Sequence, residues 1–190
     1  GSTRLQQSLA TLGGGFVRHE TEAHLRGSGI ECLLNGLYAP RGKEHVDNMI
    51  RVHHEAPGCH SNQFYKGVID DESHAVFAGK IFVHQPAQKT DAFQKNDNLL
   101  LSDDAEIDTK PELEIYADDV QCSHGATTGQ LDPAALFYLR SRGLSESEAR
   151  SALTRAFAGA VLSRIDHAAL AARVHDELDQ RLTRLLEQPA

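Results

Sequence analysis

The chain has 190 residues, of which 40% are hydrophobic and 6% aromatic, and its formal net charge is −8 at pH 7. This length suffices for one sizeable hydrophobic core, with or without an appended helical unit. An acidic chain is a poor ligand for nucleic acid or for an anionic membrane, because both require a basic surface, so we expect neither as a partner. No apolar run reaches the roughly 18 residues of a membrane span, and no signal-peptide pattern is present.

The cysteines indicate a reducing compartment. Cys32, Cys59 and Cys122 are odd in number and widely spaced, and no Cys-x-x-Cys motif occurs. Such a set is a poor disulfide framework, so we expect a cytoplasmic protein. Residues Gly1-Ser2 are typical of a cloning remnant, and we assign residues 1–4 to a tag or linker.

The first two thirds of the sequence predict short strands. Residues 8–37 contain β-type segments broken by glycine, and further strands are expected at 46–53, 61–69, 75–84, 90–94 and 105–109. Gly13-Gly14-Gly15 lacks the Lys-Ser/Thr of a phosphate-binding loop and precedes no helical pattern, so it predicts a turn. Asp103-Asp104 and Asp118-Asp119 also predict solvated turns, since adjacent strand residues face opposite ways and make poor catalytic pairs. The pattern favours an all-β solenoid, sandwich or barrel.

A weak internal repeat favours the solenoid. Residues 52–56 resemble residues 83–87, at an offset of 31. Lys66-Gly67 after Phe64 likewise resembles Gly79-Lys80 after Phe77. Imperfect repeats of this kind are typical of stacked coils that each bury an apolar side on the next.

Helical signals begin at Asp132. This residue is a plausible N-cap before Pro133, with a helix over 134–142 that stops at Gly143. Ser145-Glu146-Ser147-Glu148 is a capping box that starts a second helix, and Asp166 is expected to cap a third. The third helix carries an apolar stripe that could pack on an end of the β region, formed by Leu170, Ala171, Val174, Leu178, Leu182 and Leu185. We therefore divide the chain into a β domain over 5–130 and a helical domain over 131–190.

Cys122 and His124 form the leading candidate site. Side chains two residues apart on a strand share a face, about 6.6 Å apart at the usual rise of roughly 3.3 Å per residue. A thiolate and an imidazole can together hold one soft or borderline metal ion. The alternative is a buried, inert cysteine beside a histidine satisfied by the backbone.

A second group contains His45, His53, His54, Cys59 and His60. His53 and His54 are adjacent, so on a strand they point to opposite faces. A zinc or iron site built from His54, Cys59 and His60 competes with the simpler interpretation of loop and strand histidines without a ligand role.

Several long blocks together closely resemble the SufB/SufD family of the Suf iron–sulfur cluster assembly scaffold, over residues 7–165. They are His84-Gln85-Pro86-Ala87-Gln88-Lys89-Thr90-Asp91-Ala92, Asn96-Asp97-Asn98-Leu99-Leu100-Leu101-Ser102, Asp108-Thr109-Lys110-Pro111, Leu113-Glu114-Ile115-Tyr116-Ala117-Asp118-Asp119-Val120 and Cys122-Ser123-His124-Gly125-Ala126-Thr127. The last block is similar to the SufD branch rather than to SufB. The resemblance implies a right-handed parallel β-helix (β-solenoid) followed by a small C-terminal helical unit.

The resemblance also implies a non-enzymatic scaffold. Cys122 and His124 would lie where the chain meets a SufB-type paralogue, as ligands of iron, zinc or a nascent iron–sulfur cluster, with the other ligands coming from the partner or from sulfide. His84 is a second-tier ligand candidate in a block that is otherwise interpreted as a structural corner, in which Asn96 and Asn98 could form ladders between coils. The C-terminal helices would contact a SufC-type ATPase through residues 132–139 and 151–165. No Walker motif is present, so nucleotide hydrolysis would belong to that partner.

Three alternatives stay open. Without its paralogue, the chain could form a homodimer through the same strands. A metal-dependent β-solenoid or cupin-like enzyme, a lyase or hydrolase, is disfavoured because the chain has no His-x-His and no evident cluster of acids with arginines or lysines. A purely structural interaction module would differ only in that Cys122 and His124 bind nothing.

Overall fold

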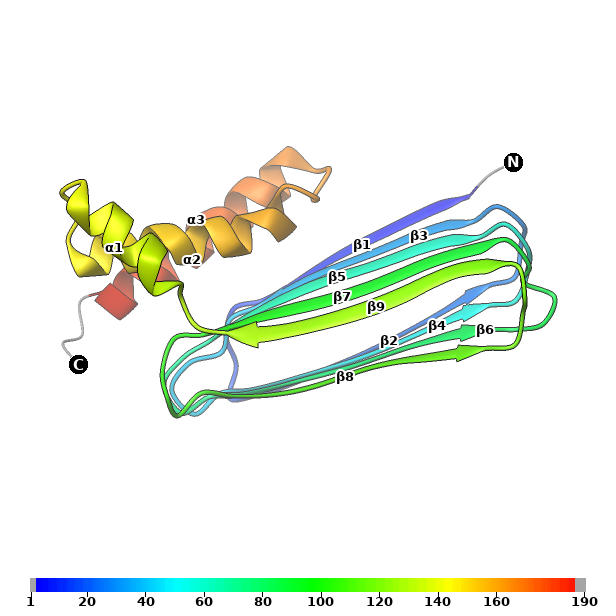
Figure 1. Cartoon of the computed structure of the whole chain (residues 1–190), viewed down its shortest axis with the longest axis horizontal. Helices are drawn as coiled ribbons and strands as arrows, with labels where there is room; N and C mark the ends of the chain where they lie inside the picture. The colour runs from blue at the N-terminus through cyan, green and yellow to red at the C-terminus, as the bar shows by residue number, and fades with distance from the viewer. Residues whose placement is uncertain (1–2, 187–190) are drawn as a thin grey trace.

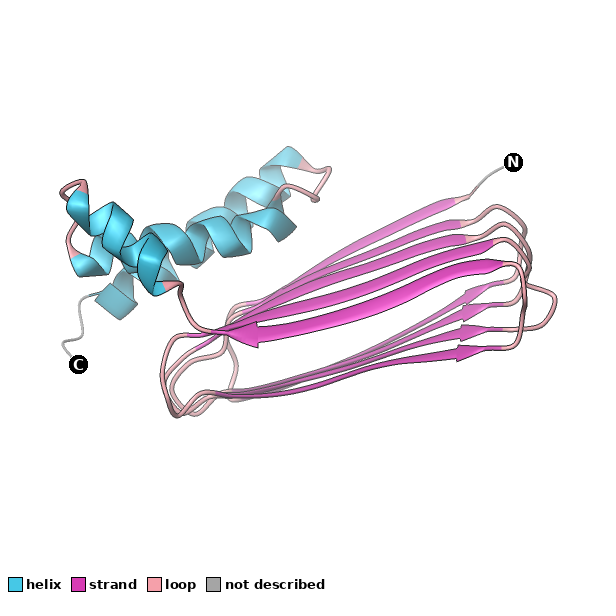
Figure 2. Cartoon of the chain, viewed as in Figure 1, coloured by secondary structure: helices cyan, strands magenta, loops and turns pink. Residues whose placement is uncertain are grey.

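The computed structural model describes residues 3–186, and the side chains through residue 182. Within this range, nine strands are followed by three helices (Figures 1 and 2). The odd-numbered strands form a five-stranded sheet, here called sheet A, and the even-numbered strands form the four-stranded sheet B. Every strand pair is parallel, which confirms the predicted parallel β-solenoid. The strands are β1 (Arg4–Thr11), β2 (Phe16–Leu25), β3 (Glu31–Tyr38), β4 (His45–His54), β5 (His60–Ile69), β6 (His74–Val83), β7 (Thr90–Leu100), β8 (Glu106–Ile115) and β9 (Val120–Gly129).

The chain alternates between the two sheets, so each coil adds one strand to each. Arg4 pairs with Glu31 and His74 with Glu106, so a coil takes between 27 and 32 residues. The predicted offset of 31 is therefore close to the coil length. Where β4 pairs with β6, however, Val52 lies opposite Ile81 rather than Val83. The repeat in the sequence is therefore displaced by two residues from the register of the strands.

Two strands are longer than predicted. β7 continues beyond residue 94 through two asparagines, and β8 continues past Pro111. Asn96 and Asn98 are buried but hydrogen-bonded, so they do not end the strand. Pro111 is tolerated because β8 is an edge strand of sheet B and one side of its backbone needs no ladder partner.

The space between the sheets is filled by apolar side chains and by a small polar network. The rings of Tyr38 and Tyr65 are fully buried, and each lies over a glycine of a neighbouring coil, Gly67 and Gly36. The Tyr38 hydroxyl donates to Asn98 Oδ1 at 2.5 Å and accepts from Asn96 Nδ2 at 2.9 Å. Asn98 also donates to Asn96 Oδ1 within its own strand, at 2.7 Å. The two asparagines thus bond to each other and to a tyrosine two coils away.

The turns agree with the sequence predictions. Residues 13–15 lie between two strands, β1 and β2, with no helix after them. Asp103-Asp104 and Asp118-Asp119 occupy exposed turns or bends before β8 and β9. The glycine segment leads into a strand rather than a helix, unlike a phosphate-binding loop, and the two Asp-Asp segments are exposed to solvent.

The first two helices begin as predicted, whereas the third does not. Asp132 accepts from the Ala134 amide at the start of α1 (Pro133–Ser141), and the Ser145 capping box opens α2 (Glu146–Leu162). The expectation that Asp166 caps the third helix is wrong. α3 (Ala168–Leu186) begins after His167, whose Nδ1 accepts from the Leu170 amide at 3.2 Å. Asp166 instead lies 3.5 Å from the Arg4 guanidinium.

α2 and α3 pack on the outer face of sheet A rather than on an end of the solenoid (Figure 1). Val174, Leu178 and Leu182 of the predicted stripe are buried, whereas Leu170 is exposed and the side chain of Leu185 lies outside the described ones. The shared cluster consists of Leu37, Ala39, Phe64, Val68, Ala158, Val161, Leu162, Val174, Leu178 and Leu182. α2, α3 and sheet A therefore share one apolar core cluster.

Arg181 adds polar anchors between α3 and the solenoid turns. Its guanidinium donates to the carbonyls of Ala39 and Leu12 and pairs with Glu44. Arg4, the last residue of the predicted tag or linker, belongs to β1 and lies 2.9 Å from Glu31. Gly1 and Ser2 of the same predicted segment lie outside the described residues. No helix in the described range is long and apolar enough to cross a membrane.

Candidate functional site

The candidate pair lies on β9, the last strand of sheet A. β9 pairs with β7 on one side, with Cys122 beside Ala92 and His124 beside Gln94. The opposite side of β9 is an edge of the sheet. Residues 123–130 are all exposed, as expected for a terminal coil that no further coil covers.

Cys122 faces the interior of the solenoid. It is half-buried and packs against a small apolar cluster that contains Ala92 and Ala117. Burial raises the pKa of the Cys122 thiol, and the negative charge of Asp91 adds to this, while a hydrogen bond with the Ala92 backbone opposes it. The thiol of the chain alone is therefore protonated at neutral pH, and a metal ion would have to displace its proton.

His124 shares the strand face of Cys122, but it is exposed. The buried Gln94 Oε1, in the residue paired with His124, has no hydrogen-bond partner among the described residues. A hollow of 460 Å³ lies beside it, lined by Asn62, Gln63, Phe64, Phe93, Gln94, Lys95, Ser123, His124, Gly125 and Arg164. The hollow beside β9 thus presents the His124 imidazole, two aromatic rings and the cationic side chains of Lys95 and Arg164.

The structure places His84 apart from this pair. His84 follows β6, and its ring centroid lies 5.8 Å from that of His53 on the preceding coil. The block from His84 to Asp91 forms a tight corner, in which the Thr90 hydroxyl donates to the Ala87 carbonyl at 2.8 Å. Within residues 3–182, no third His, Cys, Asp or Glu joins Cys122 and His124 to give three ligand atoms within 4.8 Å.

The second group does not assemble into a site. His53 points outward and His54 inward, as the alternation predicted. His54 is hydrogen-bonded to Ser61, Cys59 donates to the Gly27 carbonyl at 3.1 Å, and His60 lies 3.1 Å from Asp91. Burial, helped by the neighbouring His60, lowers the pKa of His54 to about 4. The structure therefore favours the simpler interpretation of these residues over a His54-Cys59-His60 metal site, because each side chain has a partner elsewhere.

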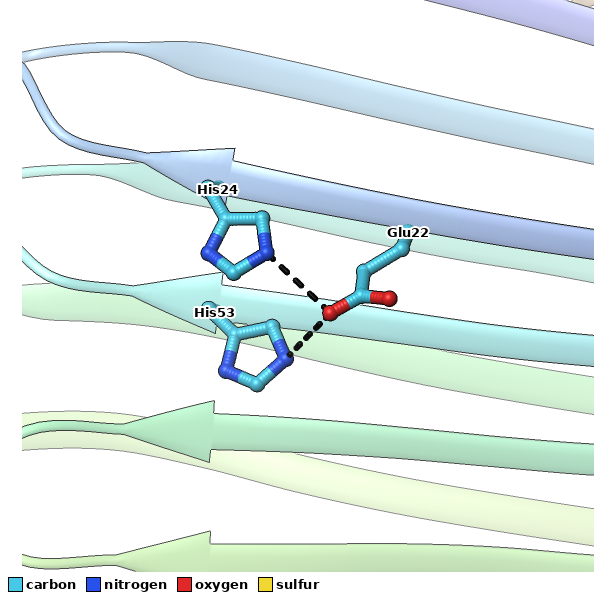
Figure 3. Close-up of side chains that lie close together, drawn as sticks. All are labelled: Glu22, His24 and His53. Carbon is cyan, nitrogen blue, oxygen red and sulfur yellow. Dashed lines mark hydrogen bonds and ion pairs between the residues drawn. The ribbon is translucent and has the colours of Figure 1, made fainter.

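One further group of possible metal ligands was not predicted from the sequence. Glu22 and His24 of β2 lie beside His53 of β4 on the outer face of sheet B (Figure 3). His24 and His53 are exact ladder partners 29 residues apart. The spacing of 29 residues can be read from the sequence, but it predicts that the two histidines are neighbours only when the coil length is known.

Comparison with known proteins places the chain in a family. Residues 2–157 match the family model described as "SUF system FeS cluster assembly, SufBD core domain". The chain is 42% identical over 171 residues to the iron–sulfur cluster assembly protein SufD of Escherichia coli, covering 90% of this chain and 40% of that protein. It is 42% identical over 163 residues to a SufBD family protein of Synechocystis, covering 86% of this chain and 36% of the relative.

A SufBD family protein of Mycobacterium leprae is 35% identical over 187 residues, which cover 94% of this chain and 48% of the relative. The chain thus spans less than half the length of each of these relatives. The family model covers all nine described strands of the solenoid, α1 and most of α2. The chain therefore belongs to the SufBD family of iron–sulfur cluster assembly proteins and is of the SufD type.

Proposed function

We propose that this chain is a non-enzymatic scaffold subunit for iron–sulfur cluster assembly in the cytoplasm. The observation that carries the proposal is the uncovered last coil, whose edge strand presents Cys122 and His124 on one face. All three cysteines are free, as a reducing compartment would keep them.

The open coil is suited to a partner with the same fold. Inward-facing Ile107 and Leu113 of β8 and Val120 of β9 are only half-buried, because no coil lies beyond them. An edge strand offers backbone groups that a strand of another chain can pair with. A SufB-type paralogue would extend the sheets and bury these side chains, and in its absence a second copy of this chain would compete for the same edge.

The pair supplies only part of a cluster site. A thiolate and an imidazole are ligands that iron and zinc accept, but a tetrahedral ion needs four. The remaining ligands would come from the partner chain or from sulfide. Assembly between two subunits explains why the ligand pair lies at an exposed edge rather than in an enclosed pocket.

The helical unit provides the second proposed contact, to a SufC-type ATPase. Among its described residues α1 has no buried side chain, and it exposes Phe137 by 74% and Tyr138 by 55%. In the other predicted segment, residues 151–165, Ala158 and Val161 are already packed into the cluster on sheet A. We therefore place the ATPase contact mainly on α1. α1 packs on α2, and α2 packs on sheet A, so a displacement of α1 would be transmitted through α2 to the sheet whose edge strand is β9.

The proposal is tested by anaerobic reconstitution with iron and sulfide, using the chain co-purified with its SufB-type and SufC-type partners. Cys122→Ala and His124→Ala should still form the complex but lose most of the cluster absorbance. Ser123→Ala is the matched control, since Ser123 lies between the two and points to the other face. If both variants load clusters as the wild type does, the pair has no ligand role and the chain is a purely structural module.

A further inference from the structure

A row of stacked rings crosses the outer face of sheet B, a different sheet from the one that contains β9. His24, His53 and Phe82 are ladder partners on β2, β4 and β6. The rings of His24 and His53 are 4.5 Å apart and nearly parallel, at 4°, and those of His53 and Phe82 are 4.4 Å apart at 3°. Phe82 thus covers one face of His53 and His24 covers the other, which fixes the His53 ring.

Glu22 reaches both imidazoles. It precedes His24 by two residues and therefore shares its strand face. Glu22 Oε1 lies 3.1 Å from His24 Nε2 and 3.3 Å from His53 Nε2 (Figure 3). With metal–ligand bonds of about 2.0–2.1 Å, neighbouring ligand atoms of a tetrahedral zinc ion are roughly 3.3 Å apart. Both nitrogen–oxygen separations already have this value.

The third separation, between the two imidazole nitrogens, must shorten before both can bind one ion. The three ligand atoms lie within 4.8 Å of one another, so the two imidazole nitrogens must approach by at most about 1.5 Å to reach the same spacing. His24 lies on the first strand of sheet B, has an exposed side chain and can tilt toward the more buried His53. The lone pair of an imidazole nitrogen lies in the ring plane, so two nearly parallel stacked rings do not bind one ion together. The exposed His24 ring must therefore rotate out of the stack to close the site, while His53 stays against Phe82.

Two features distinguish this cluster from an ordinary surface ion pair. His53 Nε2 is buried and makes no hydrogen bond within the described residues, although the Glu22 carboxylate is 3.3 Å away. The other nitrogen of His24, Nδ1, is 2.5 Å from Glu55 Oε1, and Glu55 is in turn held by Arg26 at 3.1 Å. Histidines that bind metals almost always donate their second N–H to a carboxylate or carbonyl, which orients the ring and raises its basicity.

We propose that Glu22, His24 and His53 form a site for one divalent transition-metal ion, with Zn²⁺ as its representative. Two imidazole nitrogens and one carboxylate oxygen form a set that zinc accepts, with solvent completing the coordination. Hard ions such as Mg²⁺ and Ca²⁺ prefer all-oxygen sets and are not expected. The bound ion would join β2 to β4, so it would link the first two coils of sheet B. This site shares no residue with the proposed cluster-assembly edge and does not depend on it.

The test is Zn²⁺ binding by calorimetry, together with Co²⁺ absorption spectroscopy, on the full chain. His24→Gln, His53→Gln and Glu22→Gln should each weaken binding of one equivalent of Zn²⁺ at least tenfold. Glu55→Gln, which removes only the orienting carboxylate, should weaken it about tenfold. His74→Gln is the matched control, because His74 lies on the same face of sheet B and pairs with Asp108, outside the cluster. Glu22→Gln leaves both rings and their stacking in place, so a folding defect cannot account for its effect.

Co²⁺ separates this site from Cys122 and His124, since only thiolate ligation adds an intense charge-transfer band in the near ultraviolet. The expected spectrum has ligand-field bands without that band, and these bands are lost in the Glu22, His24 and His53 variants. The proposal is overturned if these three variants bind Zn²⁺ as the wild type does. It is equally overturned if His74→Gln weakens binding as much as they do, or if the only Co²⁺ signal is the thiolate band.

Discussion

Truncation of Leu178 tests whether the helical unit is anchored on sheet A. Leu178 is 2% exposed and belongs to the cluster that joins α3 to α2 and sheet A, whereas Leu170 of the same helix is 43% exposed. Leu and Ala are both strong helix formers, so the change to alanine should act through packing. Leu178→Ala removes about 2 kcal/mol of burial free energy and leaves a cavity, for a total loss of about 3 kcal/mol.

The matched variant Leu170→Ala removes the same atoms from an exposed position, and its free energy of unfolding should change by less than about 0.5 kcal/mol. Urea denaturation followed by circular dichroism measures both. For a domain of this size, the loss in Leu178→Ala corresponds to a melting temperature lower by about 6–12 °C. Hydrogen exchange should show faster exchange in α3 of that variant. Equal effects of the two substitutions would refute the packing of α3 on sheet A.

Three further predictions concern the solenoid interior. Gly67→Ala would place a Cβ 2.3 Å from the buried Tyr38 ring, and urea denaturation should show a free energy of unfolding lower by about 1–3 kcal/mol. Gly129→Ala is the control, because its Cβ would meet no atom within 4 Å and the free energy of unfolding should change little. Similar values for both variants would contradict the packing of Tyr38 on Gly67. Tyr38→Phe leaves the amides of Asn96 and Asn98 without their bridging hydroxyl and should lower the free energy of unfolding by about 1–3 kcal/mol, and a neutral result would show that the network is not formed. The folded-state pKa of His54 is about 4, below the unfolded value of 6.5, so the unfolded chain takes up the proton first and stability falls as the pH drops from 6.5 to 4. The loss approaches about 3 kcal/mol. His54→Gln should reduce this slope in denaturation at several pH values, and an unchanged slope would disprove the assignment.

Much of the local structure follows from neighbouring residues. Alternation along a strand predicted that His53 and His54 point to opposite faces and that Cys122 and His124 share one, and both features depend only on the pleat of a strand. The caps at Asp132 and Ser145 were equally predictable, because a capping side chain bonds to an amide two or three residues away. The length of β7 was not, since the tyrosine that satisfies Asn96 and Asn98 comes from two coils earlier.

The groupings that depend on coil length were decided by the tertiary structure. His24 meets His53 only because 29 residues complete the coil between them, and a shift of one residue would turn one ring to the other face. For the same reason, His84 lies near His53 rather than near Cys122. The apolar stripe of α3 was visible in the sequence, and such a stripe predicts a buried face but not the surface it packs on. In the structure that surface is the outer face of sheet A, with Leu37, Phe64 and Val68. The sequence by itself determined the alternation along the strands, the caps at Asp132 and Ser145 and the shared face of Cys122 and His124 on β9, because these arise from contacts within a few residues. The tertiary structure decided which distant side chains meet, because their separation is set by the length and stacking of whole coils.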